Sequence, residues 1–220
     1  MNKECAIAQA KEEEWKRIQR DTAVERDWWK PSAMFASDTQ ARQALDRREL
    51  VALPPVHPGL KLIGILNSSE GGEPNWIRPG TWHYIGDLVA EWMHTNGYTN
   101  ISLAVTSVGR TAEIQKKLCA GEQQYRASKP MQSAHIAGAA VDLSLRSYYR
   151  QTENGFQSVT VWHPETGFNG DIPLSFLETV RRLQKSDAFN ICVEHMINEQ
   201  GSTPSVLYIC VSPNTVRQYT

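Results

Sequence analysis

Cysteine is scarce in this sequence, which has four cysteines among its 220 residues: Cys5, Cys119, Cys192 and Cys210. They are too few and too far apart for the disulfide framework of a small secreted domain, and none belongs to the CxxC pair of a structural zinc site. We therefore expect reduced thiols. A chain of this length does not need such cross-links, because a single hydrophobic core is large enough to stabilise it.

Long apolar segments are also lacking. The longest stretch with few charges, residues 60–67, has the length of a strand, whereas a membrane-spanning helix needs about 20 apolar residues. The first residues lack the apolar segment and the small-residue cleavage site of a secretory signal. We expect no membrane span, and a cytoplasmic location for the chain as written or an exported one if a leader has been removed.

Neither sign of charge is in excess, since 23 Lys and Arg side chains stand against 24 Asp and Glu, for a formal net charge of -1. The basic residues alternate with glutamates, as in residues 11–20, and form no patch. Proteins that bind nucleic acid usually carry a basic excess that neutralises phosphates, so we expect no nucleic-acid partner. The sequence also lacks a Walker loop and a GxSxG elbow, which argues against nucleotide-dependent chemistry and serine hydrolysis.

Helical patterns dominate the first 60 residues, which we interpret as an N-terminal helical extension of a domain over residues 61–220. Residues 3–30 are rich in Glu, Lys, Arg, Gln and Ala and predict a long surface helix that ends before Pro31. A second helix is expected over residues 38–51.

The expected domain contains helices followed by strands. Apolar residues at helical spacing predict a helix from Thr81 to a stop at Gly97, and strict alternation predicts a strand over residues 101–107. The remaining predictions are a loop over 68–79, a helix from Thr111, a short strand within 133–145, a long insertion over 147–171, a helix from Pro173 to Leu183, and a hairpin over 191–197 and 206–211. Helices that precede a small antiparallel sheet are typical of an α+β fold.

The register of the C-terminal hairpin can be predicted if its turn is symmetric. Cys192 then faces Cys210, and Glu194 faces Tyr208. Because neighbours on a strand point to opposite faces, His195 would point away from the face that Glu194 shares with Tyr208. A one-residue bulge would change this register. In an oxidising compartment, the predicted register would allow Cys192 and Cys210 to cross-link.

The stretch that ends at Asp142 carries the clearest chemistry. It places the imidazole of His135 and the carboxylate of Asp142 on either side of a turn made of Gly and Ala, before a strand. A His and an Asp so placed can reach one ion, and the small residues let the backbone come close without steric cost. Upstream, Arg110 follows the end of the strand over residues 101–107, where a fixed guanidinium could hold a carboxylate or an oxyanion.

At these residues the sequence resembles the zinc D-alanyl-D-alanine peptidases of cell-wall metabolism, which share their fold with the hedgehog signalling domain. Their signature, S-x-H-x-x-G-x-A-x-D, is matched at all of its fixed positions by Ser133, His135, Gly138, Ala140 and Asp142. A second family element, Ser-x-x-Arg-Thr at the end of a strand, is matched by Ser107, Arg110 and Thr111. The resemblance covers about residues 80–213 in the order of its elements, and the first 60 or so residues lie outside it.

The resemblance implies a hedgehog-like fold and a role for each matched polar residue. His135 and Asp142 would bind a zinc ion. Arg110 would bind substrate or stabilise the tetrahedral intermediate, and Ser133 would lie beside the substrate.

The family completes its site near the C-terminus with a catalytic glutamate and with a histidine as third ligand. We favour Glu194 as the general base over Glu199, which lies at the hairpin turn. The position expected for the third ligand holds Tyr208, whose phenol ordinarily titrates at about 10 and binds metals poorly at neutral pH. The third ligand stays unassigned, with Tyr208 and His195 as the candidates.

Three functions are compatible with these residues. The first is a zinc hydrolase, a carboxypeptidase or endopeptidase that uses a zinc-activated water on D-amino-acid-containing peptides of peptidoglycan or on a free D,D-dipeptide. The second is a catalytically impaired binding module of the same fold that recognises cell-wall peptide or another ligand, and it explains Tyr208 directly. The third is a structural protein in which His135 and Asp142 form a buried hydrogen-bonded pair.

Overall fold

The computed structural model describes residues 3–53, 56–63, 75–120, 132–163, 167–168, 172–184 and 187–219. The helices are α1 (Lys3–Asp21), α2 (Ala23–Trp28), α3 (Asp38–Asp46), α4 (Pro79–Asn96), α5 (Ala112–Ala120), α6 (Ile172–Leu183) and α7 (Pro213–Gln218), with the 3-10 helices η1 (Pro31–Ala33) and η3 (Ala134–Ala137). The strands are β1 (Val51–Ala52), β2 (Val56–His57), β3 (Leu60–Leu62), β4 (Trp76–Ile77), β5 (Ile101–Ser107), β6 (Ala140–Thr152), β7 (Gly155–Thr160), β8 (Trp162–His163), β9 (Gly167–Phe168), β10 (Phe189–Asn198) and β11 (Gly201–Val211).

The central sheet has the strand order β10-β11-β6-β5-β3-β2, with β7 paired to β6. Its neighbours are antiparallel except β3 and β5, which run parallel. The short pairs β1-β4 and β8-β9 lie outside this sheet. The α+β class is therefore confirmed, but the sheet is mixed and larger than the small antiparallel sheet that the sequence predicts.

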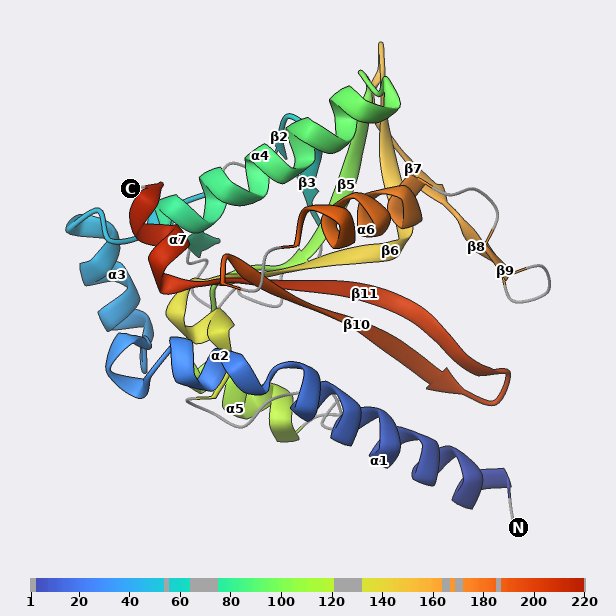
Figure 1. The fold of residues 1–220 in the computed structure, drawn as a ribbon, viewed down its shortest axis with the longest axis horizontal. Coiled ribbons are helices and arrows are strands. Elements are labelled where there is room, and N and C mark those ends of the chain that lie inside the picture. The colour runs from blue at the N-terminus through green and yellow to red at the C-terminus, as the bar shows by residue number, and fades with distance from the viewer. Residues whose placement is uncertain are drawn as a thin grey trace.

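Helices cover both faces of the sheet. In Figure 1, α4 and α6 lie on one side of the strands, and α1 and α2 run along β10 and β11 on the other side. One hydrophobic core connects these layers, because Ile18 of α1 and Trp29 after α2 are buried in the same cluster as Trp92 of α4 and Leu207 of β11. The N-terminal helices therefore pack against the strands that carry the candidate site.

The N-terminal helical region differs from its prediction in two places. The helix predicted over residues 3–30 is divided at Thr22, whose hydroxyl donates to the carbonyl oxygen of Ile18 at 2.8 Å. A threonine that bonds back to the preceding turn disturbs a helix. The second predicted helix ends at Asp46, because Arg48 adopts a left-handed conformation with φ of 62° and the chain then extends into β1.

The core elements of the domain agree with their predictions. Helix α4 ends before Gly97, which has the left-handed conformation expected of a C-terminal stop, with φ of 68°. The strand predicted over residues 101–107 is β5, and the helix predicted from Thr111 is α5. The loop predicted over residues 68–79 lies mostly outside the described residues, and its described end includes β4.

The insertion predicted over residues 147–171 is wrong in its first half. There β6 continues to Thr152, and the chain turns at Gly155, which has φ of 106°, into β7. This hairpin is largely exposed, so its sequence shows no clear alternation of apolar and polar residues. Lys61 of β3 holds it from the side, with its ammonium group 4.1 Å from the ring centre of Tyr149.

The C-terminal hairpin is confirmed, but its predicted register is wrong. The observed pairs are Cys192 with Tyr208, Glu194 with Val206 and Asn190 with Cys210. The turn consists of residues 199–200 and is therefore not centred on Gly201, and the register shifts again at a bulge after Glu194. Both effects depend on local backbone geometry that the alternation of residues along a strand does not report.

The observed register predicts that no disulfide forms across this hairpin. All four cysteines are free, and Cys192 and Cys210 are not opposite each other. A disulfide requires facing cysteines whose Cα atoms are within about 7 Å. Protein kept under non-reducing conditions and then unfolded should therefore titrate as four thiols, with the intact mass of the fully reduced chain. A titration of only two thiols would contradict the register.

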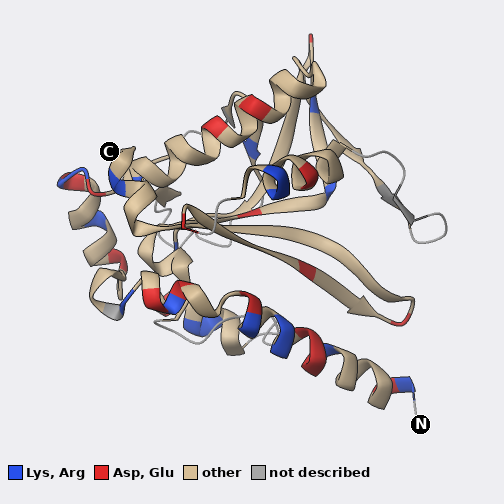
Figure 2. Ribbon diagram, in the orientation of Figure 1, with Lys and Arg blue, Asp and Glu red and all other residues tan. Residues whose placement is uncertain are grey.

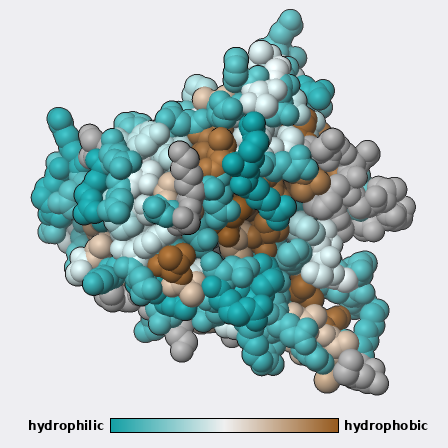
Figure 3. Space-filling model, viewed as in Figure 1, coloured by the Kyte–Doolittle hydropathy of each residue, from teal (hydrophilic) through white to brown (hydrophobic). Residues whose placement is uncertain are grey.

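Charged side chains lie mainly on the surface, and apolar side chains lie mainly in the core. The charges concentrate on the helices, especially α1 to α3, whereas the central strands carry few (Figure 2). The face in Figure 3 is mainly hydrophilic with small hydrophobic patches, and Val24 is the only large hydrophobic side chain of the described residues that is exposed, at 39%. No helix in the described segments has the length and apolar character that crossing a membrane requires.

Candidate functional site

The motif around His135 folds into a tight turn that leads into the central sheet. Helix η3 closes at Gly138, which has φ of 67°. A Cβ atom at this position would lie 3.2 Å from the backbone nitrogen of Arg78, so the turn needs glycine for its conformation and for its space. The chain then enters β6, whose third residue is Asp142. The turn thereby returns Asp142 to the side of His135.

His135 lies at the centre of the site and is 2% exposed. Its Nδ1 is 2.8 Å from the carbonyl oxygen of Val108, which can only accept a hydrogen bond, so Nδ1 carries a proton. Its Nε2 is 3.2 Å from Oδ2 of Asp142. Burial lowers the pKa of His135 and the guanidinium of Arg110 lowers it further, against the opposing effect of Asp142. A neutral imidazole therefore turns the lone pair of Nε2 toward a carboxylate oxygen.

Two lone pairs that face each other at this distance need a proton or a metal cation between them. When zinc binds nitrogen and oxygen at about 2.0 to 2.1 Å, two ligands at tetrahedral corners are about 3.3 Å apart. The distance of 3.2 Å between Nε2 of His135 and Oδ2 of Asp142 is close to this value. The hydrogen bond from Nδ1 to a backbone carbonyl is also the contact that commonly orients metal-binding histidines.

Arg110 follows β5 and is fixed from two directions. Its Nε donates to Oε1 of Gln115 at 2.6 Å, and its Nη1 donates to Oγ of Ser107 at 2.8 Å. Burial lowers the pKa of Arg110, whereas the charges of Asp142 and Glu194 oppose that shift. Because a guanidinium remains protonated in proteins, the site contains a fixed positive charge near two carboxyl groups.

Tyr208 occupies the position where the resemblance predicts the third metal ligand. It lies opposite Asp142 in the ladder between β11 and β6, and its ring meets the ring of His135 edge-on, with 5.4 Å between the centres. Its hydroxyl donates to Oε2 of Glu25 at 2.5 Å. Burial raises the pKa of Tyr208 well above its usual range, and the neighbouring Glu25 raises it further. The phenol is therefore protonated at neutral pH.

Glu25 of α2 is a buried carboxyl group, 4% exposed, that sequence reasoning did not place in the site. Besides the bond from Tyr208, its Oε1 accepts a hydrogen bond from Nδ2 of Asn190 at 2.9 Å. Burial raises the pKa of Glu25 to about 8, against the lowering effect of these two hydrogen bonds. At neutral pH most molecules therefore carry a neutral Glu25, and the charge of the site comes from the other ionisable groups.

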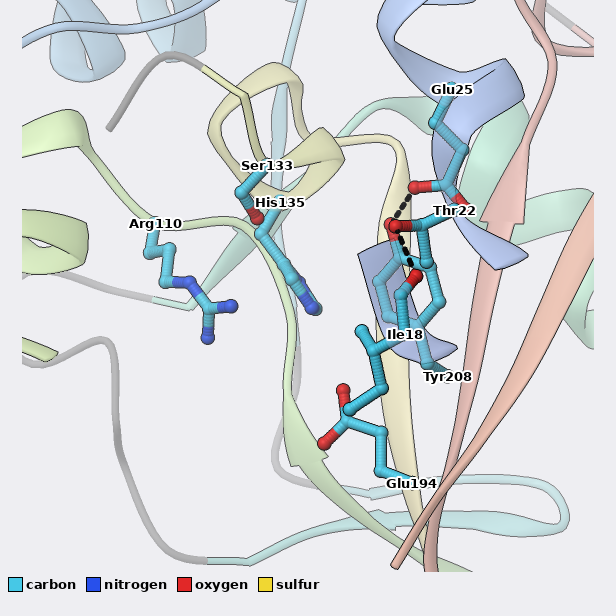
Figure 4. A pocket seen from close by; sticks show the side chains of 8 residues that line it. All are labelled: Ile18, Thr22, Glu25, Arg110, Ser133, His135, Glu194 and Tyr208. Atoms are coloured by element: carbon cyan, nitrogen blue, oxygen red, sulfur yellow. Dashed lines mark hydrogen bonds between the residues drawn. The ribbon is translucent and has the colours of Figure 1, made fainter. Parts of the chain in front are cut away.

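The structure gathers most of the predicted site residues around one pocket: Arg110, Ser133, His135, Glu194 and Tyr208. Asp142 adjoins it through His135. Figure 4 shows the guanidinium of Arg110, the imidazole of His135 and the carboxylate of Glu194 pointing toward the same space. This space has a free volume of about 20 Å³, room for about one water molecule.

His195, the other candidate for the third ligand, is held elsewhere. It follows the bulge after Glu194. Its Nδ1 lies 3.2 Å from Oε1 of Glu14 in α1, and its backbone nitrogen donates to the same oxygen at 2.8 Å. The structure thus places His195 against the N-terminal helix and outside the pocket. Glu199, the less favoured general base, forms an exposed ion pair with Lys3 at 2.9 Å.

The N-terminal segment contributes three residues to the pocket that the sequence interpretation assigned to a separate extension: Ile18, Thr22 and Glu25. In the sequence, their spacing of four and three residues predicts that they lie on one side of the single helix expected over residues 3–30. Burial of an unpaired carboxyl group is costly, so a glutamate in line with an apolar side chain on such a face is a signal for a specific partner. That signal identifies Glu25, but it does not identify Tyr208 as its partner.

Few side chains in the pocket could coordinate a metal ion. In the part of the chain that the structure describes, no group of three or more His, Cys, Asp and Glu side chains could hold a metal ion. His135 and Asp142 have the separation of two ligands, while a catalytic zinc normally has three protein ligands and a water. Among the described residues, His135 and Asp142 are therefore one ligand short of a catalytic zinc site, and Tyr208 beside them is a protonated phenol.

No family model matches this chain, and no curated protein matches it. The resemblance to the zinc D-alanyl-D-alanine peptidases therefore rests on the motif residues themselves.

Proposed function

We propose that the chain is a metal-dependent peptidase-like protein that acts on D-amino-acid-containing cell-wall peptides, as a carboxypeptidase or endopeptidase. The observation that carries this proposal is the pair of facing acceptors, Nε2 of His135 and Oδ2 of Asp142, at 3.2 Å. Arg110 and Glu194 line the same pocket and supply the other groups that peptide hydrolysis requires. The substrate class, and with it a hedgehog-like fold, comes from the resemblance of the motif.

His135 and Asp142 are the residues that would hold the zinc ion, through Nε2 and Oδ2. When bound, zinc lowers the pKa of a coordinated water and polarises a carbonyl group. The carbonyl of Val108 keeps the proton of His135 on Nδ1, so that Nε2 stays available as a ligand.

The remaining polar residues have distinct roles in the proposed reaction. Glu194 accepts a proton from the attacking water and delivers it to the leaving amine. Arg110 stabilises the negative charge that develops on the carbonyl oxygen, or binds the terminal carboxylate of the peptide. Ser133, which lines the pocket, contacts the bound peptide.

A specific contact favours a second function, a catalytically impaired binding module of the same fold. The hydroxyl of Tyr208 is engaged by Glu25, and burial raises the pKa of both groups, so neither is available as an anionic metal ligand at neutral pH. Recognition of a peptide carboxylate by Arg110 does not require a metal ion. On this reading the pocket retains ligand binding after loss of the third ligand.

Zinc content distinguishes the two functions. Protein purified without chelators or a metal-affinity tag should contain about one zinc ion per chain and should release D-alanine from peptides that end in it. The variant His135→Ala should lose both properties. The variant His94→Ala, which removes an exposed histidine of α4, is the matched control and should retain both.

A second variant tests the position of Tyr208. The change Tyr208→His places an imidazole opposite Asp142, and we expect it to strengthen zinc binding at least about tenfold, because it supplies the third ligand. Wild-type protein that lacks zinc but binds the peptide, with binding lost in Arg110→Lys, would favour the binding module. Protein that binds neither zinc nor peptide, with no gain of zinc in Tyr208→His, would contradict both functions.

A further inference from the structure

The N-terminal helices cover one particular face of the C-terminal hairpin. Asn190, Cys192 and Glu194 alternate along β10, and they share this face with Tyr208 and Cys210 of β11. Helix α1 runs along β10 on this side of the sheet (Figure 1). The two side chains that the hairpin contributes to the pocket therefore lie beneath the N-terminal segment.

Besides the burial of Ile18 and Trp29 in the core, polar contacts hold this segment in place along its length. In chain order, they join Glu14 to the backbone nitrogen of His195 (2.8 Å), Arg17 to the carbonyl of Val193, the carbonyl of Asp21 to Asn190 (2.7 Å), Glu25 to Tyr208 (2.5 Å) and Trp29 to the carbonyl of Val211 (2.9 Å). Water can replace such contacts at a small net cost in free energy. Detachment of the segment also exposes Ile18 and Trp29, which adds to its cost in free energy, but local opening of this kind requires less free energy than unfolding of the whole chain.

The volume of the pocket requires that something moves before a peptide can bind. The free space of about 20 Å³ accepts roughly one water molecule, whereas sites for small ligands measure about 300 Å³ or more. Ile18, Thr22 and Glu25 form the wall of the pocket that belongs to the N-terminal segment. Figure 4 places Glu25 and Thr22 next to Tyr208, on the side of the pocket away from Arg110.

We propose that α1 and α2 form an autoinhibitory cover, which closes the pocket in the structure described here and opens by detaching from β10 and β11. This proposal rests on the proposed function in one respect, namely that the pocket receives a peptide. The covered state is closed to peptide, and the open state exposes Glu194, Tyr208 and the space in front of His135 together.

Two native cysteines report on this opening without any added probe site. Cys192 and Cys210 are both buried on the covered face, and the Sγ of Cys192 lies 3.8 Å from Nη1 of Arg17. The other two, Cys5 and Cys119, are more accessible. In a background with Cys5→Ser and Cys119→Ser, the rate at which a maleimide labels Cys192 and Cys210, read by peptide mass spectrometry, measures how often the cover opens.

Two glutamates of α1 provide a matched pair of variants. Glu14 is 7% exposed and holds His195, whereas Glu12 forms an exposed ion pair with Lys16 on the outer side of the same helix. Both changes, Glu14→Ala and Glu12→Ala, have the same effect on helix propensity. We expect Glu14→Ala to accelerate labelling of Cys192 at least about tenfold and Glu12→Ala to leave it within about twofold of the parent. If Glu14→Ala does not fold, Asn190→Ala removes the contacts with Asp21 and Glu25 from the sheet side.

The dependence of the labelling rate on urea separates opening from unfolding. Opening of the cover exposes less surface than unfolding of the whole chain, so the accelerated rate should change less steeply with urea than the rate of global unfolding. Equal labelling rates in Glu14→Ala and Glu12→Ala would overturn the proposal, as would an acceleration with the full urea dependence of unfolding. Labelling needs neither zinc nor peptide. If the chain fails the zinc and hydrolysis tests, the proposed function is wrong, but the labelling rates still test whether the N-terminal helices open.

Discussion

Replacing Gly109 by alanine is expected to destabilise the protein by about 3 kcal/mol or more, because the new methyl group has no space. A Cβ atom at Gly109 would lie far inside van der Waals contact with the ring and with the carbonyl oxygen of Trp76. The backbone nitrogen of Gly109 donates to that same oxygen at 3.0 Å, so the two backbones cannot separate without loss of the bond. For a chain of this size, the expected fall in Tm is about 10 °C.

The change should also affect the site, because Arg110 is the next residue. The variant Gly97→Ala is the matched control: Gly97 has a left-handed conformation with φ of 68°, and no atom lies within 4 Å of the added Cβ. It should cost only about 1 kcal/mol, the price of the conformation alone. Urea unfolding of the three proteins measures both values. A loss for Gly109→Ala no larger than that for Gly97→Ala would show that the contact with Trp76 yields easily.

The stability of the protein is expected to fall as the pH rises from about 5 to 9, with Glu25 as a main cause. Burial raises the pKa of Glu25 to about 8 in the folded protein, whereas an unfolded glutamate titrates at about 4.3. Its contribution to stability is therefore fully present below the lower pKa and is lost as the pH rises through the higher one. The linked change in the free energy of unfolding is on the order of 4 kcal/mol over this window.

The variant Glu25→Gln isolates this effect. A neutral amide has nearly the shape of a protonated carboxyl group and can still bond to Tyr208 and Asn190, so the variant should lose most of the decline with pH. Glu12→Gln, at an exposed position of α1, should keep the wild-type profile. The measurement is the free energy of unfolding from urea titrations at several pH values. Parallel profiles for wild type and Glu25→Gln would mean that Glu25 titrates normally and is reached by water.

The pH profile and the cover are connected, because Glu25 is carried by α2 and bonds to the sheet. An ionised Glu25 is unfavourable where α2 meets the sheet, and its hydrogen bonds to Tyr208 and Asn190 hold the cover at the same place. The two experiments nevertheless have independent readouts, since one follows thiol labelling at constant pH and the other follows global unfolding. If Glu14→Ala accelerates labelling and Glu25→Gln loses the decline with pH, both results would point to the contact between the N-terminal helices and the hairpin.

Several features of the site could be predicted from the sequence because they are local. His135 and Asp142 are seven residues apart, and a turn closed by Gly138 returns one to the other with little freedom. The alternation of residues 101–107 defines β5, and therefore the strand end that Arg110 follows. Spacing of this kind is sufficient where a few backbone torsions determine the geometry.

The register of the hairpin and the length of β6 were not determined in this way. Alternation gives the two faces of a strand but not the residue that lies opposite, which here depends on a turn at residues 199–200 and on a bulge after Glu194. Continuation of β6 to Thr152 depends on pairing with β7, whose own residues are too exposed to give an apolar pattern. In both cases the deciding contacts are between strands.

By itself, the sequence determined the motif turn, the pairing of His135 with Asp142 and the α+β class. Only the tertiary structure decided that Ile18, Thr22 and Glu25 line the pocket and that Glu25 meets Tyr208, 183 residues further along the chain. A helical pattern defines which side of a helix is buried, but it contains no information about the surface that buries it. The surface that buries the helix is determined only when the whole core assembles, because the hydrophobic effect is not directional. The buried polar groups of distant segments then form hydrogen bonds with each other.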